Sequence, residues 1–377
     1  MKELRDIINS FELAQAEGKR AALATVVHIE GSSYRQPGAR MLVTEDGMLT
    51  GAISGGCLEG DALRKALLVI ANNAPMLVTY DTNDEDDATI GIGLGCNGII
   101  QILIEPINEQ EHNNPIALIR HLLNHRANAV LATIFSLENR KSKEAGTKFL
   151  LQQNQQRFFP VNDLLLNDLN GGALDAMKAG HLLISSLRYE NHRALFSMVQ
   201  PALSVVIVGG GNDVAPVVSI SYTLGWDTTV IDGRRNYATR ARFPKATNLL
   251  TAKPAEAISQ LRIDERTVFL LMTHNYNYDY ALLKKLVNTS TPYIGILGPR
   301  KKTDRMLREL KDEGVSLDDL QLQRIFGPTG LDTGAENAEE IALSICAEIN
   351  AMMNGRAGTS LRKKDGPIHE GNFIKAI

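Results

Sequence analysis

The sequence predicts an α/β protein in which a mixed α+β N-terminal domain precedes a domain with a doubly wound parallel sheet. Two glycine-rich stretches that each carry a cysteine lie within the first hundred residues. From Ser204 onward, short apolar strands alternate with helical stretches, which is the pattern of strand–helix–strand units. A glycine turn, Gly209-Gly210-Gly211, follows the first of these strands and precedes a helix, as in Rossmann-like domains.

Composition excludes several classes of protein. The 377 residues include 40 lysines and arginines against 43 aspartates and glutamates, a net charge of -3, so no basic surface for nucleic acid is expected. No apolar run approaches the roughly 18 residues of a membrane span. The N-terminus lacks the apolar core of a signal peptide, and three cysteines cannot form a disulfide framework. We therefore expect a soluble cytoplasmic protein of two or three domains.

The first part of the chain predicts a helix, several strands and a hairpin. Arg40–Thr44 and Met48–Ser54 are apolar runs joined through Glu45-Asp46-Gly47, and Asp-Gly between such runs is a strong hairpin signal. After Ser54–Gly60, apolar residues recur at helical spacing and predict a helix. The other elements expected here are a helix over Glu3–Glu17 and strands over Ala22–Ile29, Met76–Tyr80 and Ile99–Glu105.

Cys57 lies in the stretch Ser54-Gly55-Gly56-Cys57-Leu58-Glu59-Gly60, where a strand passes through two glycines into a helix. The unpaired N–H groups of a helix start favour anions and lower the pKa of a nearby thiol. Glu59 and Asp61 lie in the same first turn and oppose a thiolate. A reactive thiolate therefore does not follow from the helix start alone, and a functional role for Cys57 stays open at this point. The alternative is a tight turn around a small buried cysteine.

A second stretch, Gly91–Gly98, places Cys96 among glycines in the same domain. Between the two stretches, the acidic run Asp84–Asp87 lacks the spacing of a calcium loop and predicts a solvated turn. Composition shifts at Glu105-Pro106 and near residue 200 then suggest the domain limits. We expect an N-terminal cysteine and glycine-loop domain over residues 1–110, a middle segment over 111–200 that completes it and links onward, a Rossmann-like domain over 201–354 and a loose tail over 355–377.

The glycine turn of the second domain fits a dinucleotide-binding turn in part. Gly209 permits the tight turn, Gly211 lets the backbone approach a pyrophosphate, and Asp232 ends the next strand, where an acid takes ribose hydroxyls. Val214 stands where the third small residue of the fingerprint belongs, and Asp213 puts a negative charge where the phosphates would lie. The sequence therefore leaves bound NAD(P) open.

Three further loops follow strands of the parallel sheet, at the edge where such sheets bind ligands. They contain Thr273 and His274, Arg300 and Lys301, and Asp332. Cations, glycines and a histidine at one edge favour a small phosphorylated ligand. A histidine that only anchors its loop through a hydrogen bond is the alternative for His274.

With these stretches assembled, the sequence resembles the XdhC/CoxI family, the maturation factors of xanthine dehydrogenase and related molybdenum hydroxylases. The resemblance covers both ends of the chain, and residues from Pro115 to Gln200 contribute little to it. In the first domain it rests on the motifs Gly31-Ser32-Ser33-Tyr34-Arg35-x-Pro37-Gly38-Ala39-Arg40-Met41, Ser54-Gly55-Gly56-Cys57-x-Glu59-Gly60 and Gly93-Leu94-Gly95-Cys96-x-Gly98. In the second domain it rests on Gly209-x-Gly211-Asn212-Asp213, Thr273-His274, Gly295-Ile296-Leu297-Gly298-x-Arg300-Lys301 and Gly330-Leu331-Asp332-x-Gly334-Ala335.

Members of this family are thought to bind the molybdenum cofactor, help to install its terminal sulfur and hand it to the apo-hydroxylase. The resemblance therefore implies a cytoplasmic accessory protein, more a chaperone than a catalyst, and a homodimer. Its implied partners are the apo form of a xanthine dehydrogenase-type hydroxylase and a sulfur-donating desulfurase. Thiols suit a soft metal centre, so the resemblance makes Cys57 and Cys96 candidate contacts of the molybdenum. The residues implied to bind the cofactor are Arg35, Arg40, Ser54, Gly55, Gly56, Cys57, Glu59, Gly93, Gly95, Cys96, Gly98, Gly209, Gly211, Asp232, Thr273, His274, Arg300, Lys301 and Asp332.

Two other functions remain open from the sequence. The first is an NAD(P)-dependent oxidoreductase that uses the Gly209–Asp232 unit, with His274 as its acid or base. The second is a docking chaperone for the hydroxylase whose Rossmann-like domain binds protein and not nucleotide.

Overall fold

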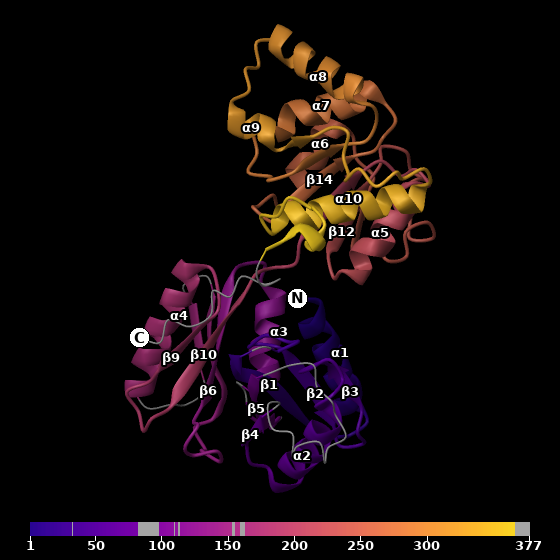
Figure 1. The fold of residues 1–377 in the computed structure, drawn as a ribbon. Helices are drawn as coiled ribbons and strands as arrows, with labels where there is room; N and C mark the ends of the chain where they lie inside the picture. Colours follow the sequence, from indigo (N-terminus) through magenta and orange to yellow (C-terminus); the bar gives the residue numbers. More distant parts are fainter. Residues whose placement is uncertain are drawn as a thin grey trace. The chain divides into compact units, whose positions relative to one another are not determined.

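The structure is a computed structural model, and it describes residues 1–31, 33–81, 98–108, 110–111, 114–152, 155–158 and 163–365. The chain divides into two compact units after Pro201. Each unit has its own sheets and its own buried core, and each is described by itself (Figure 1). Among the described residues, no helix combines the length and the apolar character needed to cross a membrane.

The first unit begins with an antiparallel five-stranded sheet in the order β3-β2-β1-β5-β4. Helix α2 packs against one face, where its apolar side meets alternate residues of the strands. Helices α1 and α3 cover part of the other face. The elements are α1 (Lys2–Ala16), β1 (Ala21–Gly31), β2 (Arg40–Thr44), β3 (Leu49–Gly51), α2 (Glu59–Asn72), β4 (Met76–Asp81), β5 (Gly98–Pro106) and α3 (Pro115–Asn124).

Residues 129–199 form a second antiparallel sheet in the order β8-β7-β6-β10-β9, with helix α4 packed on one face. Sequence patterns in this region predict strands over Ala129–Ser136 and Phe149–Gln153 alone, so β8, β9 and β10 were not predicted. The region therefore forms a complete second sheet of the first unit, and the chain continues from it into the second unit. Its elements are β6 (Ala129–Phe135), β7 (Gly146–Gln152), β8 (Gln155–Phe158), α4 (Asp163–Ala179), β9 (Leu183–Ser186) and β10 (Arg193–Val199).

The two sheets of the first unit pack together through a layer that mixes apolar and polar side chains. Val27 and Leu103 of the first sheet meet Phe135 of the second in one buried cluster. Glu105 of β5 accepts hydrogen bonds from the backbone N–H of Thr147 in β7 at 2.8 Å and from its hydroxyl at 2.7 Å. Burial raises the pKa of Glu105. These bonds join the sheets and supply the partners that a buried carboxyl group requires.

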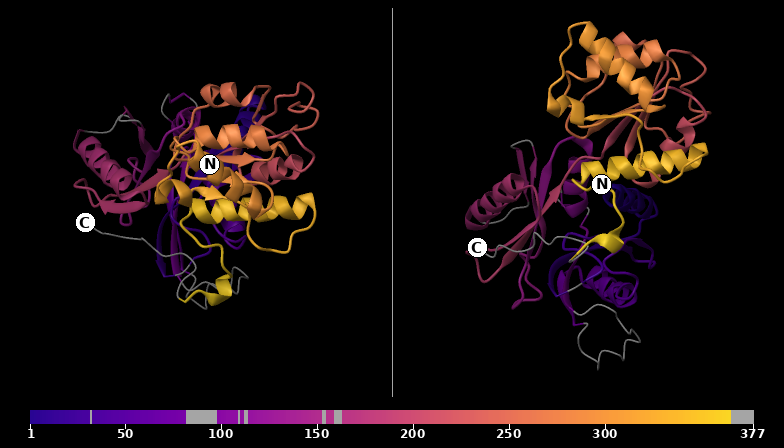
Figure 2. Two further views of the ribbon diagram at one scale, coloured as in Figure 1. Left: turned by 90° about the horizontal axis from the view of Figure 1, so that it is seen from above. Right: turned by 45° about the horizontal axis from the view of Figure 1, so that its top comes forward.

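The second unit confirms the predicted doubly wound parallel sheet. Its six strands lie in the order β13-β12-β11-β14-β15-β16 and all pair in parallel, which is the strand order of a Rossmann fold. Helices flank the sheet on both faces (Figure 2). The elements are β11 (Ser204–Val208), α5 (Val214–Thr223), β12 (Asp227–Ile231), β13 (Asn248–Leu250), α6 (Pro254–Ala257), η2 (Ile258–Gln260), β14 (Thr267–Leu271), α7 (Tyr276–Leu286), β15 (Ile294–Ile296), α8 (Arg300–Asp312), α9 (Asp319–Gln323), β16 (Ile325–Phe326), α10 (Ala338–Met353) and η3 (Leu361–Lys363).

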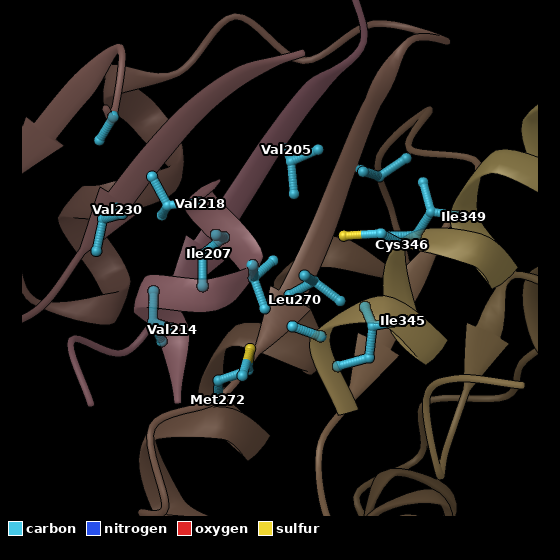
Figure 3. Close-up of a cluster of buried hydrophobic side chains, with 14 of the residues drawn as sticks. Val205, Ile207, Val214, Val218, Val230, Leu270, Met272, Ile345, Cys346 and Ile349 are labelled. Atoms are coloured by element: carbon cyan, nitrogen blue, oxygen red, sulfur yellow. The ribbon is translucent and has the colours of Figure 1, made fainter. Parts of the chain in front are cut away.

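Two buried clusters hold the helices of the second unit to its sheet. On one face, α5 and α10 pack against β11, β12 and β14; Figure 3 shows Ile345 and Cys346 of α10 among Val205, Ile207 and Leu270 of the strands. On the other face, α7 and α8 pack against the same sheet. Continuous apolar strands such as β11 are what a sheet covered on both faces requires.

Candidate functional site

The strand register brings several of the sequence motifs to one end of the first sheet. Gly31, the last residue of β1, lies opposite Gly98, the first residue of β5. Gly51, the last residue of β3, lies opposite Met41 at the start of β2. Helix α2 begins only eight residues beyond Gly51. The loops over residues 33–39 and 52–58 therefore emerge at the same end of the sheet, and we call them the first-unit loops.

Ser54 and Glu59 hold the second of the first-unit loops in shape. The Ser54 hydroxyl accepts hydrogen bonds from the backbone N–H groups of Gly56 at 3.2 Å and Leu58 at 3.1 Å. Glu59 accepts from the Ser54 backbone N–H at 2.9 Å and also from the Ser54 hydroxyl. Burial by itself would raise the pKa of Glu59, but these hydrogen bonds outweigh it and lower the pKa. Ser54 and Glu59 are therefore structural supports of the loop that carries Cys57.

The Cys57 thiol is exposed at this loop. Gly56 before it has φ +106°, a conformation that favours glycine, and a Cβ there would meet nothing within 4 Å. The neighbouring acid Asp61 accepts hydrogen bonds from the Tyr80 hydroxyl at 2.9 Å and from Arg64 at 3.0 Å. Both acids that the sequence set against Cys57 are thus engaged with other groups. The sequence predicted an apolar strand as far as Ser54, but β3 ends at Gly51, and residues 52–58 form a loop that leads into α2.

Tyr34 of the other first-unit loop lies beside the Cys57 loop, and Arg35 follows it in the chain. A Cβ on Gly55 would contact the Tyr34 ring at 3.4 to 3.7 Å, so the ring rests over this glycine. One guanidinium nitrogen of Arg35 pairs with Glu3 of α1, while its buried Nε has no hydrogen-bond partner among the described residues. An aromatic ring, a guanidinium group and a thiol therefore belong to two adjoining loops.

Arg40 lies elsewhere than the sequence suggested. It is only 2% exposed, its Nη1 donates to the carbonyl of Gly38 at 3.1 Å, and burial lowers its pKa. As the first residue of β2, opposite Thr25, it is held in the sheet and does not reach the surface beside Cys57. Three predicted residues, Gly93, Gly95 and Cys96, lie outside the described residues, so a pair of thiols stays a prediction.

The glycine turn of the second unit is tightly packed against its own chain. Gly209 has φ +122°, and a Cβ there would lie 2.3 Å from the carbonyl oxygen of Met272, which only glycine avoids. The backbone N–H of Gly210 donates to Asp232 Oδ2 at 2.8 Å. The turn between β11 and α5 thus has the tight form that the sequence predicted.

Both carboxylate oxygens of Asp232 accept hydrogen bonds from other groups of the protein. Besides Gly210, it accepts from the backbone N–H of Arg234 at 2.9 Å and from two nitrogens of the Arg234 guanidinium at 2.9 and 2.8 Å. Burial would raise the pKa of Asp232, but the bonds from Arg234 and Gly210 lower it. The Arg234 guanidinium also lies 3.3 Å above the Tyr237 ring. Arg234 therefore takes the place at Asp232 that a ribose diol would need.

Asp213 fills the phosphate side of the same turn. Its Oδ1 lies 2.3 Å from where a Cβ on Gly211 would stand, and its Oδ2 lies 3.0 Å from His274 Nε2. His274 follows β14 and has φ +55°, a left-handed conformation that is uncommon for residues other than glycine. The carboxylate and the imidazole therefore meet over the glycine turn.

Comparison with known proteins identifies the chain. A model of the XdhC and CoxI family matches residues 14–81, and one of the XdhC Rossmann domain matches residues 205–349. A Bacillus subtilis protein described as a probable xanthine dehydrogenase subunit is 30% identical over 331 residues, which cover 88% of this chain and 92% of the relative. The chain belongs to the XdhC and CoxI family. The resemblance drawn from the motifs is thereby confirmed.

Two further comparisons extend the match along the whole XdhC-type chain. PaoD of Escherichia coli, described as a molybdenum cofactor insertion chaperone, is 25% identical over 92% of this chain and 88% of its own length. A crystal structure from Bacillus halodurans described as a xanthine dehydrogenase superposes with a TM-score of 0.74 at 27% identity, and covers 94% of this chain and 98% of that one.

The first-unit loops of this XdhC-type protein fit the molybdenum cofactor by the chemistry of their donors. The Cys57 thiol suits a soft, sulfur-bound metal. The buried, unpartnered Nε of Arg35 is the kind of donor that phosphate recruits. Among the described residues, no group of three or more histidines, cysteines or acids is placed to hold a metal ion of its own.

The second unit does not fit a bound dinucleotide as it stands. The carboxylate of Asp213 lies over the glycine turn, and the Arg234 guanidinium is hydrogen-bonded to the carboxylate of Asp232. A pocket of about 190 Å³ lies beside them, lined by Asp232, Gly233, Arg234, Thr273, Asn275 and Tyr278. These contacts give no support to the NAD(P)-dependent oxidoreductase that the sequence left open.

The other residues predicted at this edge of the parallel sheet do not form one group: some are exposed, and one is bonded to a buried acid. Arg300 and Lys301 are exposed at the start of α8, and Asp332 is exposed in its loop. Sequence reasoning missed Asp279, which is fully buried and accepts hydrogen bonds from Lys302 at 2.7 Å and from the Thr273 hydroxyl at 2.6 Å. No sequence signal marks this acid, because it stands within an ordinary helical pattern. Thr273 is thus tied into a buried network.

Proposed function

We propose that this protein is a maturation factor that binds the molybdenum cofactor at its first-unit loops and supports the sulfuration of the cofactor and its insertion into an apo-hydroxylase of the xanthine dehydrogenase type. The names of two relatives, one an insertion chaperone and the other part of a xanthine dehydrogenase, support this role. The observation that carries the site is the exposed Cys57 thiol on a loop held by Ser54 and Glu59.

We propose that different residues of the site bind different parts of the cofactor. The bound cofactor supplies a dithiolene-held molybdenum and a terminal phosphate. Cys57 offers a soft donor toward the metal end, and Arg35 offers charge-assisted hydrogen bonds to the phosphate. The hydrogen bonds between Glu59 and Ser54 hold the Cys57 loop before the cofactor arrives, which reduces the entropy lost on binding.

The partners follow from the same proposal. The acceptor is the apo form of a molybdenum hydroxylase, and a desulfurase supplies the sulfur while the factor holds the cofactor. We place this exchange in the cytoplasm and expect the factor to act as a homodimer.

The test compares two cysteine variants. The purified protein is mixed anaerobically with molybdenum cofactor released from a hydroxylase, and cofactor that co-elutes with it is measured. We expect wild type and Cys346→Ala to retain it, because Cys346 is buried in the core of the second unit. We expect Cys57→Ala to lower the affinity by about tenfold or more, equivalent to about 1.4 kcal/mol.

Each remaining outcome bears on a different part of the proposal. Failure of the wild-type protein to bind any cofactor would remove the function. Equal binding by Cys57→Ala would remove the thiol from it.

A further inference from the structure

Tyr34 is an aromatic side chain whose position the proposed role of Cys57 does not use. Its side chain is 73% exposed, in a loop that runs from the exposed end of β1 to the buried start of β2. Its hydroxyl has no hydrogen-bond partner among the described residues. Scattered exposed aromatics are normal, so the neighbours of Tyr34 decide what it does.

The Tyr34 ring lies over Gly55 and packs against that residue. Three of its carbons would stand 3.4, 3.5 and 3.7 Å from a Cβ at that position. Gly55 is therefore a small residue beneath an aromatic ring, and a branched side chain there would displace the ring. Because the ring is supported from below and exposed above, one face is open to a ligand.

The groups next to this ring match one class of molecule. Arg35 follows Tyr34 in the chain. One of its nitrogens pairs with Glu3, and its buried Nε has no hydrogen-bond partner among the described residues. Cys57 stands two residues beyond Gly55 with its thiol exposed. A flat heteroaromatic ring stacks on an aromatic face, phosphate binds guanidinium, and a soft metal–sulfur centre binds a thiol. A ligand that carries all three groups complements the two loops.

We infer that Tyr34 is the platform on which the pterin ring of the cofactor stacks, with Gly55 kept small so that the tyrosine ring lies flat on the loop. This inference rests on the proposed function. It assigns the heterocycle to Tyr34, the phosphate to Arg35 and the metal end to Cys57. Tyr34 is a positioning residue, since it orients the ring while Cys57 meets the metal end.

The test measures binding of anaerobic molybdenum cofactor and of a free reduced pterin by equilibrium dialysis, and the pterin in each compartment is oxidised to its fluorescent form for detection. Tyr34→Ala should lower affinity for both probes by about tenfold to a hundredfold, which is the range found when a stacking aromatic is removed from under a base. Tyr34→Phe keeps the ring and should bind as wild type does. Tyr222→Ala, which removes a tyrosine that is 56% exposed in the second unit, is the matched control and should leave binding unchanged.

Variants of the glycine give an independent arm. Gly55→Ala adds a Cβ at ordinary contact distance from the ring and should bind nearly as wild type does, whereas Gly55→Val should lose affinity as Tyr34→Ala does. Thermal melting should be the same for Tyr34→Ala and wild type, since the side chain is largely exposed.

Two results separate the inference from the proposal beneath it. Equal binding of cofactor and free pterin by Tyr34→Ala and wild type would overturn the platform and leave the proposed function standing. Absence of cofactor binding by wild type would overturn the proposed function, and the platform with it.

Discussion

The two units each contain a glycine-rich turn between a strand and a helix, but they use it in opposite ways. In the first unit, Gly56 has open space around it and Cys57 faces solvent. In the second unit, Gly209 is pressed against the Met272 carbonyl and the mouth of the turn holds Asp213. In the first turn, glycine therefore belongs to a loop that exposes the Cys57 thiol. In the second, it allows the turn to pack closely against the backbone at Met272.

The acids near each turn account for the difference. Glu59 turns back to the N–H and hydroxyl of Ser54, so the carboxylate stabilises the loop from within. Asp213 instead folds over Gly211 and meets His274. A carboxylate that caps its own loop leaves the surface free for a ligand, whereas one that lies across the turn repels an anionic ligand.

Thiol alkylation should show the largest contrast between the two units. In a Cys96→Ser background, iodoacetamide should modify Cys57 at least about a thousandfold faster than Cys346, because Cys346 reacts only when its core opens. Cys346 lies among Ile345, Ile349 and Val205, and burial raises the pKa of its thiol to about 12 (Figure 3). Mass spectrometry of peptides follows both sites, and denatured protein should label them equally. Comparable rates in the native protein would show that helix α10 opens readily.

A pair of glycine substitutions tests the packing difference. Gly209→Ala should destabilise the second unit by about 3 kcal/mol or more, because the new Cβ meets backbone at 2.3 Å and φ is +122°. Gly56→Ala has a comparable φ but open space, and should cost about 1 kcal/mol. The single tryptophan, Trp226, packs on the core of the second unit and reports its unfolding in urea, while the loss of far-ultraviolet circular dichroism also follows the first unit and measures the cost of Gly56→Ala. Equal costs for the two variants would contradict the comparison.

Much of the fold was predictable from sequence because local patterns determine it. The continuous apolar strand over Val205–Val208 and the turn at Gly209 predicted the Rossmann fold, and Asp46-Gly47 predicted the hairpin. Strands β9 and β10 were missed, since Leu183–Ser186 is short and Arg193–Val199 begins with arginine and contains a serine. The pairing of β10 with β6 and β9 depends on tertiary contacts that no short window shows.

The site was predictable in part for a different reason. Motif and spacing located Cys57 and Asp232, but whether a side chain meets a ligand or its own chain depends on the three-dimensional neighbours. The sequence predicted that Arg40 is a cation for a ligand, but the strand register places it within β2. It also predicted that Asp232 binds a ribose, but the Arg234 guanidinium is bonded to its carboxylate. The link between Asp213 and His274 joins residues 61 positions apart.

Asp232 should contribute stability that depends on pH. Because its folded pKa is lowered, its contribution is present above the ordinary carboxyl pKa of about 4 and is lost as pH falls through the folded pKa. Asp232→Asn should therefore cost the second unit about 2 kcal/mol at pH 7 and remove that part of the acid sensitivity. Urea unfolding followed by Trp226 at several pH values measures both. Asp332→Asn, at an exposed acid, is the control and should change neither.

Asp213 provides the most direct way to convert one kind of turn into the other. Asp213→Gly removes the carboxylate from the mouth of the turn, and we expect affinity for NAD⁺ and ADP to rise about tenfold, because one negative charge near the phosphates is gone. Asp213 makes no side-chain cap bond to helix α5, so the helix should keep its stability. Calorimetry measures the affinity, and Trp226 fluorescence checks that the unit is folded.

Asp213→Asn separates charge from volume at the same position. It keeps the size of the side chain and its reach to His274, so it should gain less affinity than Asp213→Gly if occupied space matters and as much if charge alone excludes phosphate. The contrast between the turns would fail if wild type already bound NAD⁺ at micromolar concentration, or if a folded Asp213→Gly protein bound no better than wild type. The first result would mean that the turn of the second unit admits phosphate even with Asp213 present. The second would mean that Asp213 is not the group that excludes phosphate from the turn.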